Sequence, residues 1–158
     1  MGHTDPQATP PVSHRHEAPD TTAPDGSEIR PLIDRRHLVQ RASLCEVTLP
    51  AGQVSRPMRH QTVEEIWYVL EGRGRVWRSH PTSAFQSGGQ PQETPEGIVE
   101  ETVVVGPGDA LTIPTGWSFQ FSADAQTALR FLCYTNPPWP GPEEAQPAGI
   151  GGLGERTV

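Results

Sequence analysis

Short runs of alternating apolar and polar residues, separated by turns rich in glycine and proline, extend from residue 28 to residue 135. This alternation has the period of a half-buried strand, and strands spaced by about eight to twelve residues are typical of an all-β sandwich or barrel. No run has convincing helical periodicity. We therefore predict an all-β fold with strands over residues 28–33, 43–49, 65–70, 73–78, 98–105, 110–113, 117–121 and 128–135.

The alternation also predicts which side chains point inward, because successive residues of a strand face opposite sides of the sheet. The inward sets are Cys45, Val47 and Leu49; Met58 and His60; Glu65, Trp67 and Val69; Trp117, Phe119 and Phe121; and Leu129, Phe131 and Cys133. Glu64 then points outward, so Glu65 is the glutamate of this pair that we expect inside. We interpret Cys45 and Cys133 as small buried core residues, because no sequence neighbour would lower a thiol pKa.

The composition limits the ordered part of the chain. Only 34% of the 158 residues are hydrophobic, and 16 glycines and 18 prolines are present, which suggests polar tails around one compact centre. We expect a disordered tail over residues 1–26, a single barrel domain over 27–140 and a flexible tail over 141–158. The polar stretch 79–97 predicts a mobile insertion loop.

The charge pattern excludes several classes of function. The formal net charge is -7 and there is no basic run, so neither nucleic acid nor an anionic membrane is an expected partner. The chain has no lysine, which excludes Schiff-base chemistry. No apolar stretch reaches the ~18 residues of a membrane span, and no signal peptide is recognisable, so we expect a cytoplasmic protein with a small-molecule partner.

Two spacing patterns along the chain give further evidence about the fold and the site. In the first, five residues separate Gly52 from the triplet 58–60 (Met-Arg-His), four more precede Glu65, and six more precede Gly72. In the second, five residues separate Gly108 from the triplet 114–116 (Pro-Thr-Gly), and two more precede Phe119.

With both patterns in this order, the chain resembles the cupin superfamily of small β-barrels over roughly residues 28–138. The resemblance implies a jelly-roll barrel of two antiparallel sheets, and a homodimer. It also implies a metal site of three histidines and one glutamate, but Met58 and Phe119 stand at two of the histidine positions. Because only His60 and Glu65 remain as ligands, we expect no tightly bound cofactor. A weakly bound divalent metal at these two residues stays an alternative.

Without a metal, His60 and Glu65 are candidates for an acid/base pair, because a nearby carboxylate raises the pKa of an imidazole. The surrounding pocket would be apolar and aromatic, and so would suit a hydrophobic or aromatic molecule. Its expected lining is Met58, Trp67, Trp117, Phe119, Phe121, Phe131 and Cys133, with Arg56 and Arg59 at the mouth.

Three functions remain open from the sequence. The first is a metal-independent isomerase, lyase or cyclase that moves protons with His60 and Glu65. The second is a non-catalytic module that binds or senses a hydrophobic ligand. The third is a metal-dependent dioxygenase with an altered metal site.

Overall fold

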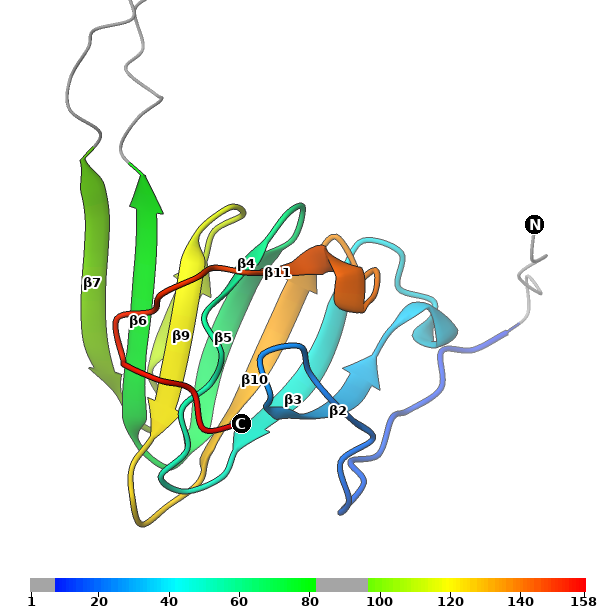
Figure 1. The fold of residues 1–158 in the computed structure, drawn as a ribbon. Helices are drawn as coiled ribbons and strands as arrows, with labels where there is room; N and C mark the ends of the chain where they lie inside the picture. The colour runs from blue at the N-terminus through cyan, green and yellow to red at the C-terminus, as the bar shows by residue number, and fades with distance from the viewer. Residues whose placement is uncertain (1–7, 82–96) are drawn as a thin grey trace, which may run out of the picture.

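A computed structural model describes residues 8–81 and 97–158, which form two antiparallel sheets facing each other as a jelly-roll barrel (Figure 1). The six strands of one sheet, in spatial order, are β1 (Thr21–Thr22), β2 (Glu28–Ile33), β3 (Ser43–Leu49), β10 (Leu129–Asn136), β5 (Glu64–Glu71) and β8 (Ala110–Ile113). The five strands of the other are β11 (Ala145–Pro147), β4 (Met58–His60), β9 (Ser118–Ala123), β6 (Gly74–Pro81) and β7 (Ile98–Val105).

The strands predicted from alternation are all present. β2, β3, β7 and β8 have the predicted bounds, and β5, β9 and β10 differ by one or two residues. β6 runs on to Pro81, so residues 79–81 belong to a strand and not to the expected loop, whereas residues 82–96 lie outside the described residues. The very short strands β1, β4 and β11 were not predicted, because two or three residues are too few to show a period.

The remaining ordered elements are two short 3-10 helices, η1 (Arg35–His37) and η2 (Pro142–Glu144). The helix η1 lies in the polar connection between β2 and β3. Within the described residues, no helix is long and apolar enough to cross a membrane.

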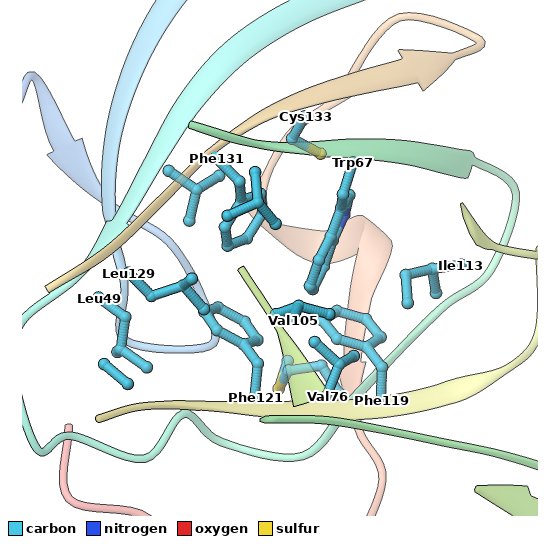
Figure 2. Packing of buried hydrophobic residues seen from close by; sticks show 14 of the residues in the cluster. Leu49, Trp67, Val76, Val105, Ile113, Phe119, Phe121, Leu129, Phe131 and Cys133 are labelled. Atoms are coloured by element: carbon cyan, nitrogen blue, oxygen red, sulfur yellow. The ribbon is translucent and has the colours of Figure 1, made fainter. Parts of the chain in front are cut away.

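An aromatic cluster packs between the two sheets and forms the core (Figure 2). Trp67 of β5 stacks on Phe131 of β10 with ring centroids 4.2 Å apart, and both come from the six-stranded sheet. Phe119 and Phe121 of β9 approach Trp67 edge-on from the opposite sheet, at 5.8 and 5.2 Å. Edge-to-face and offset-stacked contacts of this kind each add about 0.5–1.5 kcal/mol to the stabilisation from burial. The alternation therefore predicts the inward faces of β5, β9 and β10 correctly.

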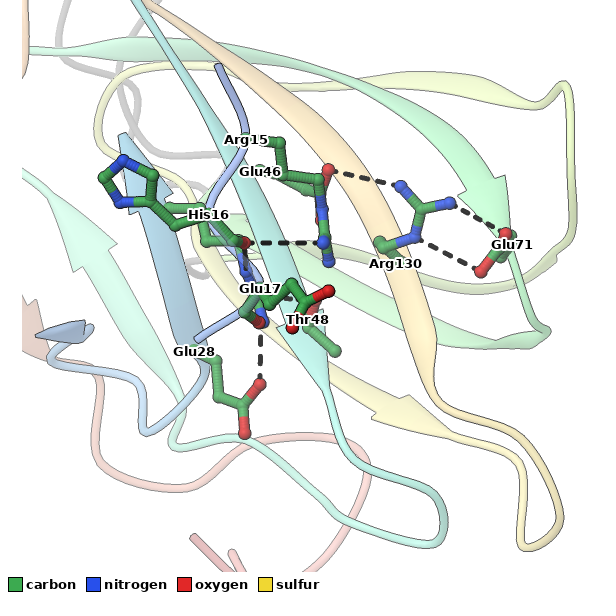
Figure 3. Close-up of polar contacts among 9 residues, drawn as sticks. Arg15, His16, Glu17, Glu28, Glu46, Thr48, Glu71 and Arg130 are labelled. Atoms are coloured by element: carbon green, nitrogen blue, oxygen red, sulfur yellow. Dashed lines mark hydrogen bonds and ion pairs between the residues drawn. The ribbon is translucent and has the colours of Figure 1, made fainter. Parts of the chain in front are cut away.

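The N-terminal segment, residues 15–25, lies on the barrel, contrary to the disorder expected for residues 1–26. Arg15 pairs with Glu46 at 2.7 Å, and Glu46 also pairs with Arg130 at 3.2 Å (Figure 3). Glu46 is only 3% exposed, because the segment covers it on the outer face of the six-stranded sheet. A carboxylate removed from water needs such cationic partners to stay ionised.

Arg30 of β2 fixes the same segment through its backbone. The guanidinium donates to the carbonyl of His16 at 2.9 Å and to that of Glu17 at 2.6 Å (Figure 3). After these contacts the chain forms β1, which pairs with β2 at the edge of the six-stranded sheet. The tail predicted over residues 1–26 thus includes a segment with defined contacts to the barrel, and residues 1–7 lie outside the described residues.

The C-terminal segment, residues 141–158, also differs from the flexible tail that we expected. It crosses the outer face of the five-stranded sheet (Figure 1), where Gln120 is fully buried. The Gln120 amide donates to the carbonyls of Ser55 at 3.0 Å and Gly154 at 2.9 Å, and its oxygen accepts from the amide of Leu153 at 2.8 Å. A Cβ at Gly152 would lie 2.1 Å from the ring of Trp77, so only glycine permits this close approach.

Candidate functional site

A cavity of about 610 Å³ opens between the two sheets beside the aromatic cluster. β3, β4, β5, β9 and β10 form its inner walls, and the N-terminal segment, β2 and the residues after β10 form its outer walls. The inner lining includes Cys45, Val47, Met58, His60, Glu65, Trp67, Phe119, Phe131, Cys133 and Thr135, and the outer lining includes residues 21–25, Ile29, Trp139 and Ala145.

His60 and Glu65 face each other across this cavity from different sheets. His60 ends β4, and residues 61–63 carry the chain across to β5, where Glu65 points inward. The Nδ1 atom of His60 lies 3.4 Å from Oε1 of Glu65, and the two residues are 4% and 7% exposed. The indole nitrogen of Trp67 donates to Oε2 of Glu65 at 2.7 Å. The first spacing pattern therefore encodes one corner of the barrel that holds both polar side chains inside.

The imidazole of His60 is held by aromatic rings. Phe119 and Trp139 approach it edge-on, with ring centroids 5.0 and 5.3 Å away. Its Nδ1 atom is buried and has no hydrogen-bond partner among the described residues. A buried polar atom without a partner is costly, so this nitrogen is a natural contact for a polar group of a bound molecule.

Glu144 fixes the corner from outside. Its Oε1 atom accepts from the amides of Thr62 at 2.5 Å and Val63 at 2.7 Å, and its Oε2 atom accepts from the Thr62 hydroxyl at 2.9 Å. Burial alone would raise the pKa of Glu144, but these hydrogen bonds outweigh it, and the pKa is lowered. The next residue, Ala145, pairs with His60 in the sheet. The C-terminal segment therefore positions the site.

Burial moves the pKa values of His60 and Glu65 in opposite directions. Loss of water raises the pKa of Glu65 to about 7, although hydrogen bonds from Trp67 and Cys133 oppose the shift. Loss of water lowers the pKa of His60 to about 4, although the negative charge of Glu144 opposes it. At neutral pH the imidazole is therefore uncharged, and the carboxyl group is close to half ionised.

These shifts correct the predicted effect of Glu65 on the pKa of His60. The sequence predicted that a carboxylate would raise the pKa of His60, which is lowered instead. The physical reason is that burial disfavours the charged imidazolium, and Glu65, whose own pKa is raised to about 7, offers no negative charge at the pH where His60 titrates. Of these two residues, Glu65 is therefore the one that titrates near neutral pH.

The structure brings most of the predicted pocket residues together, with four exceptions. Arg59 is exposed, because in β4 it lies between the inward residues Met58 and His60. Trp117 precedes β9 and stacks on His80, with centroids 5.3 Å apart, outside the cavity lining. Phe121 packs in the aromatic cluster, where Trp67 and Phe131 separate it from the cavity. Arg56 is also exposed and absent from the lining.

Sequence reasoning missed the contributions of both chain ends. Asp25 lines the cavity from the N-terminal segment, and its Oδ1 atom accepts from the amide and hydroxyl of Ser27 at 2.9 and 2.6 Å. Burial raises its pKa. The run Asp25-Gly26-Ser27 signals a turn, but nothing local shows that the turn meets the barrel. Trp139 follows the last predicted strand and carries no periodic signal.

The side chains at this site do not fit the four-ligand metal centre implied by the resemblance. Met58 and Phe119, which occupy two ligand positions, are direct cross-strand neighbours and both point inward. Neither offers the nitrogen or oxygen donors that divalent metals prefer. Among residues 8–81 and 97–158, no group of three or more His, Cys, Asp or Glu side chains could hold a metal ion. We derive no chemical step through a metal.

Two facing antiparallel sheets form a jelly-roll barrel around a cavity, which is the cupin fold. No family model matches the chain. A relative in Methanocaldococcus jannaschii, the uncharacterised protein MJ1618, is 28% identical over 116 residues, which are 73% of this chain and 77% of that protein.

Solved structures share the fold at lower identity. The polyketide cyclase RemF from Streptomyces resistomycificus is 21% identical, with a TM-score of 0.57 over 87% of this chain and 81% of RemF. Oxalate decarboxylase from Bacillus subtilis is 16% identical, with a TM-score of 0.59 over 86% of this chain and 30% of the enzyme. At these identities the likeness establishes the fold and not the reaction.

Proposed function

We propose that this protein binds a small hydrophobic or aromatic molecule in the cavity and moves a proton on it without a metal. The observation that carries the proposal is Glu65, a carboxyl group that is 7% exposed, lines an apolar cavity and has its pKa raised to about 7. A group that titrates near the working pH is suited both to take and to return a proton.

The proposed roles follow from the contacts. Glu65 takes a proton from an acidic C–H or O–H group of the substrate, and Trp67 stabilises the ionised carboxylate through its indole N–H. The proton then returns to another atom of the same molecule, which gives an isomerisation. The same first step gives elimination when a leaving group departs, and ring closure when the resulting carbanion attacks a carbonyl group. His60, neutral and with Nδ1 unpartnered among the described residues, orients a polar group of the substrate.

The cavity supports an aromatic or alicyclic substrate. Met58, Trp67, Phe119, Phe131 and Trp139 line it beside the two polar residues. A volume of about 610 Å³ lies within the range of ordinary small-molecule sites. The fold is shared with a polyketide cyclase, which is compatible with this class of substrate. The homodimer, the cytoplasmic location and the lack of a cofactor stay predictions.

The test uses a panel of neutral aromatic ketones with 2-tetralone as reference. Binding is measured by ligand-induced thermal shift, and proton abstraction by NMR detection of deuterium uptake at the carbon next to the carbonyl. We expect wild-type protein to bind and to accelerate uptake. Glu65→Gln should still bind but lose about 100-fold or more of the rate. The matched control is Glu64→Gln, which changes the adjacent exposed glutamate and should behave as wild type.

Two results would contradict the proposal in different ways. Tight binding with no deuterium uptake across the panel would favour the non-catalytic binding module. Uptake that Glu65→Gln leaves unchanged would place the proton-transfer group elsewhere in the chain.

A further inference from the structure

The two cysteines of this protein lie directly opposite each other in the cavity wall. Cys45 of β3 pairs with Cys133 of β10 in an antiparallel ladder that keeps one register from Ser43↔Thr135 to Leu49↔Leu129. Both side chains are on the inner face and line the cavity. Both thiols are free. The proposed function assigns no role to Cys45 or to Cys133.

The placement of this pair suits a disulfide bond. Directly opposed residues of antiparallel strands have Cα atoms about 4.5–5.5 Å apart. Disulfides require a Cα separation of about 4.4–6.8 Å, so the ladder already holds both residues in range. The two side chains also lie on the same face of the ladder, because both line the cavity. A disulfide bond can therefore join them within the existing strand pair.

The two thiols differ in their surroundings. Cys133 is 4% exposed, and its contact with Cys45 and its burial raise its pKa well above the ordinary 9.0. Cys45 is more exposed, in the intermediate range, and borders the cavity. A small oxidant that enters the cavity therefore meets Cys45 first, and Cys133 is placed to attack the oxidised sulfur.

We propose that Cys45 and Cys133 form a reversible disulfide bond across β3 and β10, which makes the cavity wall a redox-modification site. With hydrogen peroxide as oxidant, the Cys45 thiolate attacks one peroxide oxygen and hydroxide leaves, which gives a sulfenic acid. The Cys133 thiol then attacks the Cys45 sulfur, the S–O bond breaks, and the thiol proton leaves with the hydroxyl group as water. In total, two thiols and one peroxide give one disulfide and two waters, and a dithiol reductant reverses the reaction.

The bond would reach the candidate site through a single contact. Cys133 and Glu65 both line the cavity, and the Cys133 thiol opposes the rise in the pKa of Glu65, so oxidation removes a group that favours the ionised carboxylate. Trp67 then remains as the donor to Glu65. Any effect on turnover rests on the proposed function, whereas the disulfide itself does not.

The experiment treats the reduced full-length chain with stoichiometric hydrogen peroxide. Remaining thiols are then blocked with N-ethylmaleimide in denaturant, and the intact mass is recorded. We expect no maleimide adducts, a loss of about 2 Da, and full recovery of two adducts after dithiothreitol. After trypsin, peptides 42–59 and 131–156 should be joined before reduction. Cys45→Ser and Cys133→Ser, each shown by circular dichroism to be folded, should retain one adduct and form no internal link.

Specific results would overturn the proposal. Two maleimide adducts on treated native protein would show that the pair does not close. Oxygen atoms added to Cys45 with Cys133 still free, or a disulfide between two copies of the chain, would have the same consequence. Deuterium uptake by 2-tetralone is measured separately on both redox forms, so failure of turnover leaves the mass result intact.

Discussion

Glu144 offers a sharp test of how the C-terminal segment holds the candidate site. Its carboxylate accepts the amides of Thr62 and Val63 and the hydroxyl of Thr62, and it is only 7% exposed. Glu144→Ala removes all three contacts. We expect this change to destabilise the whole barrel, because residues 61–63 connect its two sheets.

The structure gives the size of the effect. Thr62 is exposed, so water replaces its lost contacts at little cost, but Val63 is fully buried and its amide is left unpaired. A hydrogen bond to a charged group is worth about 1.5–3 kcal/mol, and an unpaired buried donor costs about 1–3 kcal/mol. We therefore expect Glu144→Ala to lower the free energy of unfolding by about 3 kcal/mol. For a domain of this size that corresponds to a fall in Tm of about 6–12 °C.

Urea denaturation followed by tryptophan fluorescence measures this change. The matched control is Glu143→Ala, because Glu143 is exposed and, among the described residues, its backbone carbonyl is the group that accepts hydrogen bonds, from Gln61 and Gln146. The pKa of Glu144 is lowered on folding, so its stabilising effect is complete above pH 4.5 and is lost as the pH falls through the folded pKa. Equal midpoints for the two variants at neutral pH would refute this account.

Two other substitutions test the site and the outer face. The pKa of Glu65 rises from 4.5 to about 7 on folding, so the stabilising contribution of this group should fall by roughly 3 kcal/mol as the pH rises through that window, while the lowered pKa of His60 acts in the opposite direction. The free energy of unfolding of wild type relative to Glu65→Gln should therefore fall by that amount in urea titrations between about pH 5 and about pH 8, and parallel curves for both proteins would exclude the shift. Gln120→Ala removes three contacts to Ser55, Leu153 and Gly154, so amide exchange at Leu153 should accelerate at least about tenfold. Gln146→Ala, a half-buried control, should leave Leu153 protected, and unchanged exchange in Gln120→Ala would contradict the anchoring role.

The strands and their inward faces could be predicted from the sequence because both depend on a local period of two. Trp67, Phe119 and Phe131 lie inside for that reason. Gly72 follows the last residue of β5, at a point where a Cβ would lie 2.0 Å from the carbonyl oxygen of Ala128. Burial of the outward residues Glu46 and Gln120 could not be predicted, because distant segments of low periodicity cover them. The pKa reversal at the candidate site had the same cause, since it depends on how much water the folded barrel excludes.

One end of the N-terminal segment is anchored on the outer face of the barrel and the other end lines the cavity. Docking of the segment and binding in the cavity are therefore energetically coupled. Residues 15–17 are held by Arg30 and Glu46 on the outer face, and residues 21–25 form a wall of the cavity. A molecule in the cavity thus binds the docked form of the segment, and its apparent affinity is reduced by the fraction of molecules in which the segment is detached. Salt that screens the outer ion pairs would weaken binding from a distance, and a tight ligand would in turn protect residues 15–25 from proteases.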